Sequence, residues 1–161
     1  MTSLMAETSS QRSSQQWGFT LIEMMVVVLL LSIIMGLSIP GYRQYVQRAN
    51  RTDATSDLLR LAAGQERFYL QNGTYATNAQ LAAAPPAGLG FTGGKTQRGY
   101  YNVAITLANA TRFTATATTD GAEKQKDDYK CETFRINESG LREAADDGGV
   151  YSAATAEECW R

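Results

Sequence analysis

The sequence contains no histidine, and it contains only two cysteines and three prolines among 161 residues. Without histidine the chain lacks the usual general base, a frequent zinc ligand, and the Ser–His and Cys–His pairs of nucleophilic enzymes. Charge of either sign is not in excess, because 15 Lys and Arg stand against 16 Asp and Glu. The net charge of −1 gives no strong signature for binding nucleic acid or an anionic surface. An enzyme is therefore the least supported function class, and we expect no catalytic residue, no metal and no cofactor.

Two cysteines are too few for a structural zinc site in a chain without histidine. Cys131 and Cys159 both lie in the C-terminal region. Their spacing suits one disulfide in an oxidising compartment, and two free thiols in a cytosolic protein are the alternative. A disulfide here would close a loop of about 30 residues, worth about 3.5 kcal/mol if it acts on the entropy of the unfolded chain.

The longest apolar run covers residues 19–40, in which Glu23 is the only formal charge. As a helix this run would extend about 33 Å, enough to cross the hydrocarbon core of a bilayer. It shows no polar stripe of the kind that a soluble surface helix carries. Thr20, Ser32 and Ser38 are small, and their hydroxyls can bond back to helix carbonyls. The run therefore predicts a membrane-spanning or assembly-core helix.

Glu23 is the anomaly in this run, because a carboxylate inside a membrane helix costs about 2.5–3.5 kcal/mol on insertion scales. One interpretation is that Glu23 lies near the helix end and extends to the membrane interface. The other is that its charge awaits a partner on another subunit. Cleavage after Gly18 would create an α-amine on Phe19, and that amine on a neighbouring subunit could neutralise Glu23.

The sequence Gly18-Phe19-Thr20-Leu21-Ile22-Glu23, after a short polar leader and before an apolar helix, resembles the class III signal of type IV pilins. The resemblance implies a leader at 1–18, a transmembrane or filament-core helix at 19–40, and a globular head at 41–161. It also implies that a prepilin peptidase cuts between Gly18 and Phe19 and methylates the new N-terminal Phe19. The leader differs from the usual pattern, since residues 15–17 are Gln-Gln-Trp where basic residues are common.

The orientation signals conflict. Arg43, Arg48 and Arg51 follow the apolar run and only Arg12 precedes it, so the positive-inside rule places the C-terminal side in the cytoplasm. The cysteine pair and the pilin resemblance place the head outside. We follow the leader motif, which is more specific. We expect a single-pass inner-membrane protein with a cytoplasmic leader and a periplasmic head, which becomes extracellular on assembly into a pilus.

Beyond the apolar run, Pro40-Gly41 predicts a bend and the pattern becomes amphipathic. Apolar positions recur at three- and four-residue spacing up to Asn72-Gly73, which is a helix stop. This pattern puts Tyr42 and Tyr45 on the packed face and Arg51 on the other side. The sequence therefore predicts one kinked helix from residue 19 to about 72, about 80 Å long.

The remaining chain predicts an antiparallel sheet with four strands at 99–107, 112–119, 129–137 and 141–145. In the first of these, Tyr101, Val103, Ile105 and Leu107 share a face. Residues 74–98 read as a loop with a short helical piece at 78–83, pinned by Leu89 and Phe91. The fold class is thus α+β. It resembles the type IV pilin fold, a long kinked N-terminal helix on a four-stranded sheet with a disulfide-closed C-terminal loop.

Short matches outside the N-terminus are similar to PilE-like minor pilins. They are Gln65-Glu66-Arg67-Phe68-Tyr69, Asn72-Gly73-Thr74-Tyr75, Gly99-Tyr100-Tyr101 and Cys159-Trp160. The resemblance implies a minor pilin that is assembled from the inner membrane into a type IV pilus. Its role would be pilus biogenesis, and through it adhesion, twitching motility and, as an open option, DNA uptake. Its expected partners are other pilin subunits through the N-terminal helix, the prepilin peptidase and the inner-membrane assembly machinery.

Two further clusters are weighed against plain surface charge. The acidic pairs at 146–147 and 157–158 could ligate Ca²⁺, but no EF-hand spacing supports this and solvated charge is favoured. A basic patch for DNA could form from Lys95, Arg98, Lys124, Lys126 and Lys130. Glu123, Asp127 and Asp128 stand among them, which favours a mixed-charge surface. The alternatives to a structural subunit are a DNA- or surface-binding tip pilin and a type II secretion pseudopilin.

Overall fold

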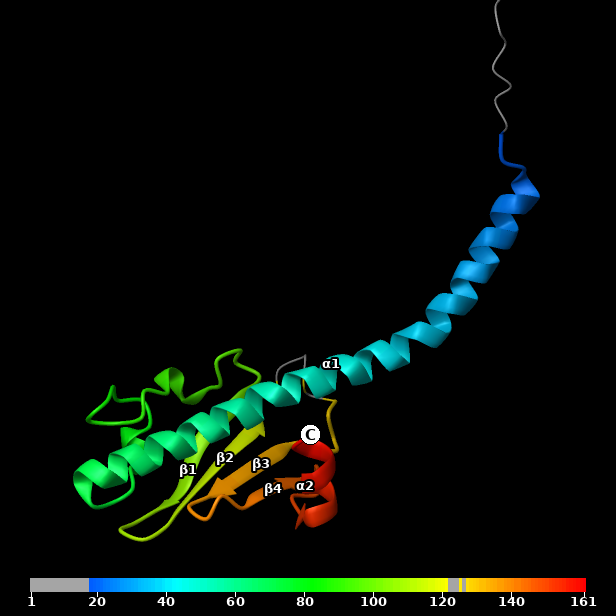
Figure 1. Ribbon diagram of the computed structural model, residues 1–161. Coiled ribbons are helices and arrows are strands. Elements are labelled where there is room, and N and C mark those ends of the chain that lie inside the picture. The colour runs from blue at the N-terminus through cyan, green and yellow to red at the C-terminus, as the bar shows by residue number, and fades with distance from the viewer. Residues whose placement is uncertain (1–17, 122–124, 126) are drawn as a thin grey trace, which may run out of the picture. The chain divides into compact units, whose positions relative to one another are not determined.

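The computed structural model describes residues 18–121, 125 and 127–161. The chain divides into two compact units, Met1–Pro40 and Gly41–Arg161. The predicted leader lies outside the described residues except for Gly18. One 52-residue helix, α1 (Leu21–Asn72), has residues in both units (Figure 1). The helix is assigned without a break through Pro40 and Gly41, and the bend predicted there stays a prediction.

Within the second unit, the head, α1 buries one narrow stripe. Its buried positions with core side chains follow heptad-like spacing: Ala54, Leu58, Leu61, Gln65 and Phe68. The helix ends at Asn72 as predicted, and Gly73 follows with a φ of 68°. Its N–H donates to the Tyr69 carbonyl, a C-terminal arrangement that glycine adopts without steric cost.

The sheet is an antiparallel meander in the order β1-β2-β3-β4-β5. The predicted four strands are confirmed, with bounds that differ by a few residues: β1 (Tyr101–Ala108), β2 (Phe113–Thr119), β3 (Thr133–Asn137) and β4 (Arg142–Ala145). The third strand begins four residues later than predicted, because the chain from Asp128 to Cys131 makes a turn in which the Cys131 N–H donates to the Asp128 carbonyl.

Leu107 does not share the buried face of β1. A register shift between Ile105 and Leu107 inserts one extra residue opposite β2. Since side chains alternate faces with a period of two, that bulge moves Leu107 outward, and its side chain is 41% exposed. The prediction that Leu107 lies on the packed face was wrong for this reason.

The C-terminal tail contains structure that the sequence did not predict. A two-residue strand, β5 (Tyr151–Ser152), pairs with β4, and the helix α2 (Ala153–Cys159) follows at once. The Ser152 hydroxyl accepts a hydrogen bond from the Thr155 N–H at 3.0 Å, which caps α2. A disulfide between Cys131 and Cys159 then joins the end of α2 to the turn before β3, as expected from the two cysteines.

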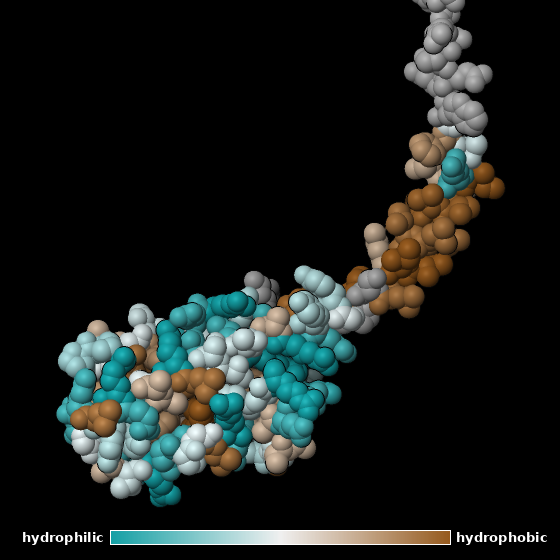
Figure 2. All heavy atoms as spheres, in the orientation of Figure 1, coloured by the Kyte–Doolittle hydropathy of each residue, from teal (hydrophilic) through white to brown (hydrophobic). Residues whose placement is uncertain are grey.

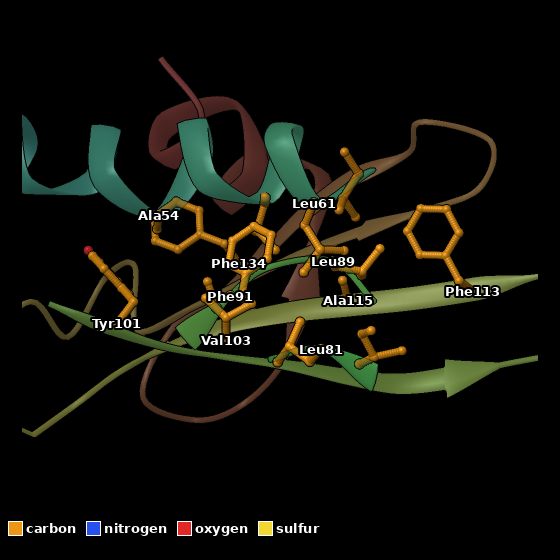
Figure 3. Packing of buried hydrophobic residues seen from close by; sticks show 14 of the residues in the cluster. Ala54, Leu61, Leu81, Leu89, Phe91, Tyr101, Val103, Phe113, Ala115 and Phe134 are labelled. Carbon is orange, nitrogen blue, oxygen red and sulfur yellow. The ribbon is translucent and has the colours of Figure 1, made fainter. Parts of the chain in front are cut away.

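The core lies between α1 and the sheet (Figure 3). Tyr101 and Phe134 meet edge to face with ring centroids 5.6 Å apart, and Trp160 adds a second such contact to Phe134. Leu89 and Phe91 are buried in the same cluster, so the loop between α1 and β1 is pinned as predicted. The helical piece predicted at 78–83 is shorter than expected, η1 (Asn78–Gln80), and a second short one, η2 (Thr92–Gly94), was not predicted.

A buried ion pair ties α1 to the loop before β3. The Arg51 guanidinium donates two hydrogen bonds to the Asp128 carboxylate, both at 2.7 Å. Burial alone would lower the pKa of Arg51, but the hydrogen bond and charge of Asp128 together raise it above its ordinary value. Gln125 completes the contact, since it accepts from the Asn50 amide and donates to Asp128. Arg51 is therefore buried, which corrects the prediction that it lies on the outer side.

We expect the disulfide to stabilise the C-terminal tail. Replacing both cysteines, Cys131→Ser with Cys159→Ser, should lower the free energy of unfolding by about 3.5 kcal/mol, because the unfolded chain regains the entropy of a loop of about 30 residues. Urea unfolding of the exported protein measures this, and limited proteolysis should cut more readily after residue 145. Two free thiols in the exported wild-type protein under non-reducing mass spectrometry would contradict the pairing.

We also expect a large cost when the ion pair is broken from one side. Arg51→Met should destabilise the head by about 3–5 kcal/mol, because the Asp128 carboxylate stays buried without its partner. The double variant with Asp128→Leu should lose less than the sum of the single losses, as a double-mutant cycle would show. Arg67→Met on the exposed side of the same helix is the control, with an expected change within about 0.5 kcal/mol. Equal losses for Arg51→Met and the control would rule out a structural role for the pair.

Candidate functional site

The residues of the predicted cleavage site precede α1 and are exposed. Gly18, Phe19 and Thr20 are outside the helix, and the Phe19 side chain is 79% exposed. A Cβ built on Gly18 would meet nothing within 4 Å. The bond between Gly18 and Phe19 therefore lies in a non-helical, accessible segment, which is the state in which a protease can bind a peptide in extended form.

Glu23 makes local contacts that the sequence analysis did not foresee. Its backbone N–H donates to the Thr20 hydroxyl at 3.3 Å, and its carboxylate accepts from the Thr20 N–H at 3.5 Å. These reciprocal bonds are a capping box, for which Thr-x-x-Glu before an apolar run is the sequence pattern. Thr20-Leu21-Ile22-Glu23 shows that pattern, so the sequence did contain the signal. The single contact to the carboxylate is long, at 3.5 Å, so the carboxylate keeps most of its capacity to bind a charged partner.

The apolar part of α1 has its hydrophobic side chains exposed. The large hydrophobic side chains described from Leu21 to Ile39 are all exposed, and Figure 2 shows hydrophobic side chains along this segment. The Ser32 hydroxyl donates to the carbonyls of Val28 and Leu29 at 2.8 Å each, as expected for a hydroxyl in an apolar helix. By length and composition this helix could cross a membrane.

In the head, two buried carboxylates hold the turn formed by residues 95–99, here called the basic turn. Asp57 accepts a hydrogen bond from the Gln97 N–H at 2.7 Å, and Asp53 accepts one from the Arg98 N–H at 3.2 Å. Both carboxylates come from α1, 40 and 45 residues earlier in the chain. The backbone of the turn is thereby fixed, while the Lys95 and Arg98 side chains remain exposed.

Charges around the basic turn are only partly balanced. Lys95 pairs with Asp120 at 2.7 Å, and this bond, with a second one from Asn102, lowers the pKa of the Asp120 carboxyl. The contribution of that pair to stability is present above the ordinary carboxyl pKa and is lost as the pH falls through the lowered value. No ion pair joins Arg98 to another of the residues that the structure describes. Beneath the turn, burial raises the pKa of Tyr101, which stays neutral.

The predicted basic patch does not form one surface among the described residues. Lys95 and Arg98 share the basic turn, whereas Lys130 lies beside α2 and pairs with Glu158 at 3.3 Å. Lys124 and Lys126 lie outside the described residues. Lys130 instead lines a hollow of about 250 Å³ together with Gln44, Gln47, Arg48 and Tyr129. This hollow was not predicted, because its walls come from segments about 80 residues apart and no local pattern links them.

Three of the four acidic candidates for Ca²⁺ have side-chain partners in the head. Asp146 accepts from the Gly148 N–H, Glu157 pairs with Arg161, and Glu158 pairs with Lys130. Across the described residues, no group of three or more potential ligands lies close enough to hold a metal ion. These carboxylates stabilise the turn at residues 146–148 and the C-terminal end of α2.

Comparison with known proteins gives matches for both the N-terminal motif and the head. Residues 14–39 match the family model described as "Prokaryotic N-terminal methylation motif". The chain is 31% identical over 129 residues to the type IV major pilin protein PilE1 of Neisseria gonorrhoeae, covering 78% of this chain and 55% of that protein. It is 35% identical over 77 residues to the type II secretion system core protein G of Klebsiella pneumoniae, covering 45% of this chain and 55% of that protein.

Among solved structures, the non-core minor pilin PilV of Neisseria meningitidis matches with a TM-score of 0.43 and 21% identity, covering 70% of this chain and 96% of that one. The chain spans 55% and 66% of the length of two of the PilE1 proteins that it matches. The match that covers most of the head is to a family model, over residues 40–135. The chain therefore belongs to the family described as type IV minor pilin ComP, DNA uptake sequence receptor.

Proposed function

We propose that this chain is a minor pilin that enters a type IV pilus and binds double-stranded DNA with its head. The precursor is cut between Gly18 and Phe19, and Phe19 is N-methylated. Residues 19–40 hold the subunit in the inner membrane, with residues 1–18 on the cytoplasmic side and 41–161 in the periplasm. Assembly then moves the subunit into the pilus. The observation that carries the proposal is the family match over the head, next to a methylation motif that coincides with the bare apolar helix.

Assembly is the role we assign to Glu23. Among the described residues its carboxylate accepts one long hydrogen bond, from the Thr20 N–H at 3.5 Å, so the charge is weakly compensated. In a pilus it can instead meet the Phe19 amine of a neighbouring subunit, which neutralises both groups in an apolar core. Only one axial register of the helices brings these groups together, so the pair sets alignment more than it adds stability.

DNA binding is assigned to the basic turn, residues 95–99. Asp53 and Asp57 fix its backbone, so the Lys95 and Arg98 side chains project from an ordered turn rather than from a mobile loop. Arg98 is more available than Lys95 to bind a phosphate, because Lys95 already pairs with Asp120. The turn lies inside the segment that matches the DNA uptake receptor family. With few cations in play, we expect weak binding that depends on salt.

We expect Glu23→Gln to reduce incorporation into pili. Glutamine keeps the capping geometry, since Glu and Gln both serve in a capping box, and it removes only the charge. Thr20→Ala is the matched control, because it removes the cap and leaves the charge. Immunoblots of sheared pili measure incorporation, and N-terminal sequencing of the membrane fraction should start at Phe19 for all three proteins. The registry role is wrong if Glu23→Gln assembles at wild-type levels, or if Thr20→Ala fails equally.

We expect Arg98→Gln to weaken DNA binding. One phosphate contact fewer should lower the slope of log K against log salt concentration by about 1, and Lys95→Gln should add a smaller loss. The full chain in detergent is titrated with labelled double-stranded DNA and followed by fluorescence anisotropy. Arg112→Gln is the control, an exposed cation in the turn between β1 and β2. Equal losses for Arg98→Gln and Arg112→Gln would show that the basic turn is not part of the interface. A wild-type protein that does not bind DNA would rule out the DNA function.

A further inference from the structure

The tyrosines of the head differ in whether solvent can reach their hydroxyl groups. Tyr42 and Tyr45 are 69% and 72% exposed. The prediction from their spacing that they lie on the packed face was wrong, because the first buried residue of α1 within the head is Asn50. Tyr101, by contrast, is fully buried, and its hydroxyl has no hydrogen-bond partner among the described residues. Buried hydroxyl groups are nearly always hydrogen-bonded, so this one calls for a partner.

Asp53 carries the other unpartnered buried side-chain atom in the part of the chain that the structure describes. The residue is 6% exposed, and its Oδ1 atom accepts the Arg98 N–H at 3.2 Å. No donor among the described residues reaches its Oδ2 atom. A buried carboxylate oxygen without a hydrogen bond costs more free energy than a neutral group, because its charge is kept from water. The two unpartnered atoms are therefore a hydroxyl that can donate and a charged oxygen that can accept.

Both atoms belong to residues that hold the basic turn. Asp53 holds it at Arg98, whereas the Tyr101 backbone holds it at Thr96. The Thr96 N–H donates to the Tyr101 carbonyl at 3.0 Å, and the Tyr101 N–H donates to the Thr96 hydroxyl at 3.2 Å. Figure 3 shows the Tyr101 side chain extending from β1 toward α1 on the side of Ala54, which follows Asp53 in the chain. The hydroxyl and the carboxylate thus approach each other beneath one turn.

The groups around the Tyr101 hydroxyl limit what can join it to Asp53. Burial raises the pKa of Tyr101, and the charges of Asp128 and Asp53 raise it further, so the hydroxyl keeps its proton and can donate it. The Arg51 guanidinium is engaged by two bonds to Asp128, and the Gln125 amide already donates two bonds and accepts one. One carboxylate oxygen and one neutral hydroxyl are too few ligands for a metal ion. Water accepts from a hydroxyl and donates to a carboxylate, so it satisfies both atoms.

We propose that one buried water molecule joins the Tyr101 hydroxyl to Asp53 Oδ2, and that Tyr101 thereby positions Arg98 for DNA. The water accepts the hydroxyl proton in a hydrogen bond and donates one to Oδ2, which fixes the rotation of the carboxylate so that Oδ1 faces the Arg98 N–H. Tyr101 then holds the basic turn at both ends, directly at Thr96 and through the water and Asp53 at Arg98. Tyr101 is a positioning residue, because it is buried and does not touch DNA. The role in DNA binding rests on the proposed function, whereas the water does not.

The test is Tyr101→Phe in the full chain in detergent, which removes the hydroxyl and keeps the ring that packs against Phe134. We expect the Arg98 amide to exchange its hydrogen about tenfold faster by nuclear magnetic resonance, because the carboxylate that accepts it is no longer held. Binding of double-stranded DNA should weaken about threefold at low salt. The slope of log K against log salt concentration should stay unchanged, because Arg98 still contacts its phosphate. Arg98→Gln lowers that slope, so the loss of positioning is distinguished from the loss of a contact.

The matched control is Tyr75→Phe, which removes a hydroxyl that donates to Glu66 at 3.1 Å on another part of α1. It should leave exchange at Arg98 and DNA binding unchanged. A crystal structure of the wild-type chain should show a water within hydrogen-bond distance of both the Tyr101 hydroxyl and Asp53 Oδ2.

A direct bond between Tyr101 and Asp53 in that crystal, or unchanged exchange at Arg98 in Tyr101→Phe, overturns the inference. Faster exchange with unchanged DNA affinity overturns the positioning role. Faster exchange in a chain whose wild type does not bind DNA supports the water and overturns the DNA function of the basic turn, so the two failures are told apart.

Discussion

The head depends on burying one stripe of α1 against the sheet. Leu58 and Leu61 are fully buried in the same core as Phe134, and removal of this apolar area from water is the main favourable term in folding. The same stripe also carries polar side chains that hold loops. Gln65 bonds both backbone groups of Ala76, Asp53 and Asp57 hold the basic turn, and Arg51 holds Asp128. A single helix face thus fixes three loops on the head.

This arrangement separates the tasks of a minor pilin along one chain. The large hydrophobic side chains described in the apolar part of α1 are exposed, which suits a segment that is covered by lipid or by other subunits. The backbone of the basic turn is fixed by Asp53 and Asp57 from the buried part of the helix. Substitutions of its exposed Lys95 and Arg98 side chains therefore leave the hydrophobic core untouched. Loops on a rigid frame can change their binding properties without loss of the fold.

Covalent and non-covalent contacts together hold the C-terminal tail on the head. The pairing of β5 with β4 involves only two residues, which is too little for independent stability. The disulfide at Cys159 and the contact of Trp160 with Phe134 attach α2 to the core. The indole N–H also donates to the Glu143 carbonyl at 2.9 Å. The tail thereby supplies Glu158 beside the hollow that Lys130 and Arg48 line.

Local patterns were enough to predict the helix end at Asn72, the four main strands, the disulfide and the motif around Gly18 and Glu23, because each depends on neighbours in the chain or on pairing two cysteines. The burial of Arg51 and the exposure of Tyr42 and Tyr45 could not be predicted this way. Arg51 meets a carboxylate 77 residues away, and helical periodicity does not reveal such a partner. The bulge that turns Leu107 outward, β5, and the hold of Asp53 and Asp57 on the basic turn likewise depend on contacts between distant segments. The sequence by itself therefore determined the family and the secondary-structure elements. The tertiary structure decided which charged and aromatic side chains are buried and which are exposed, because burial depends on what the fold packs over each position.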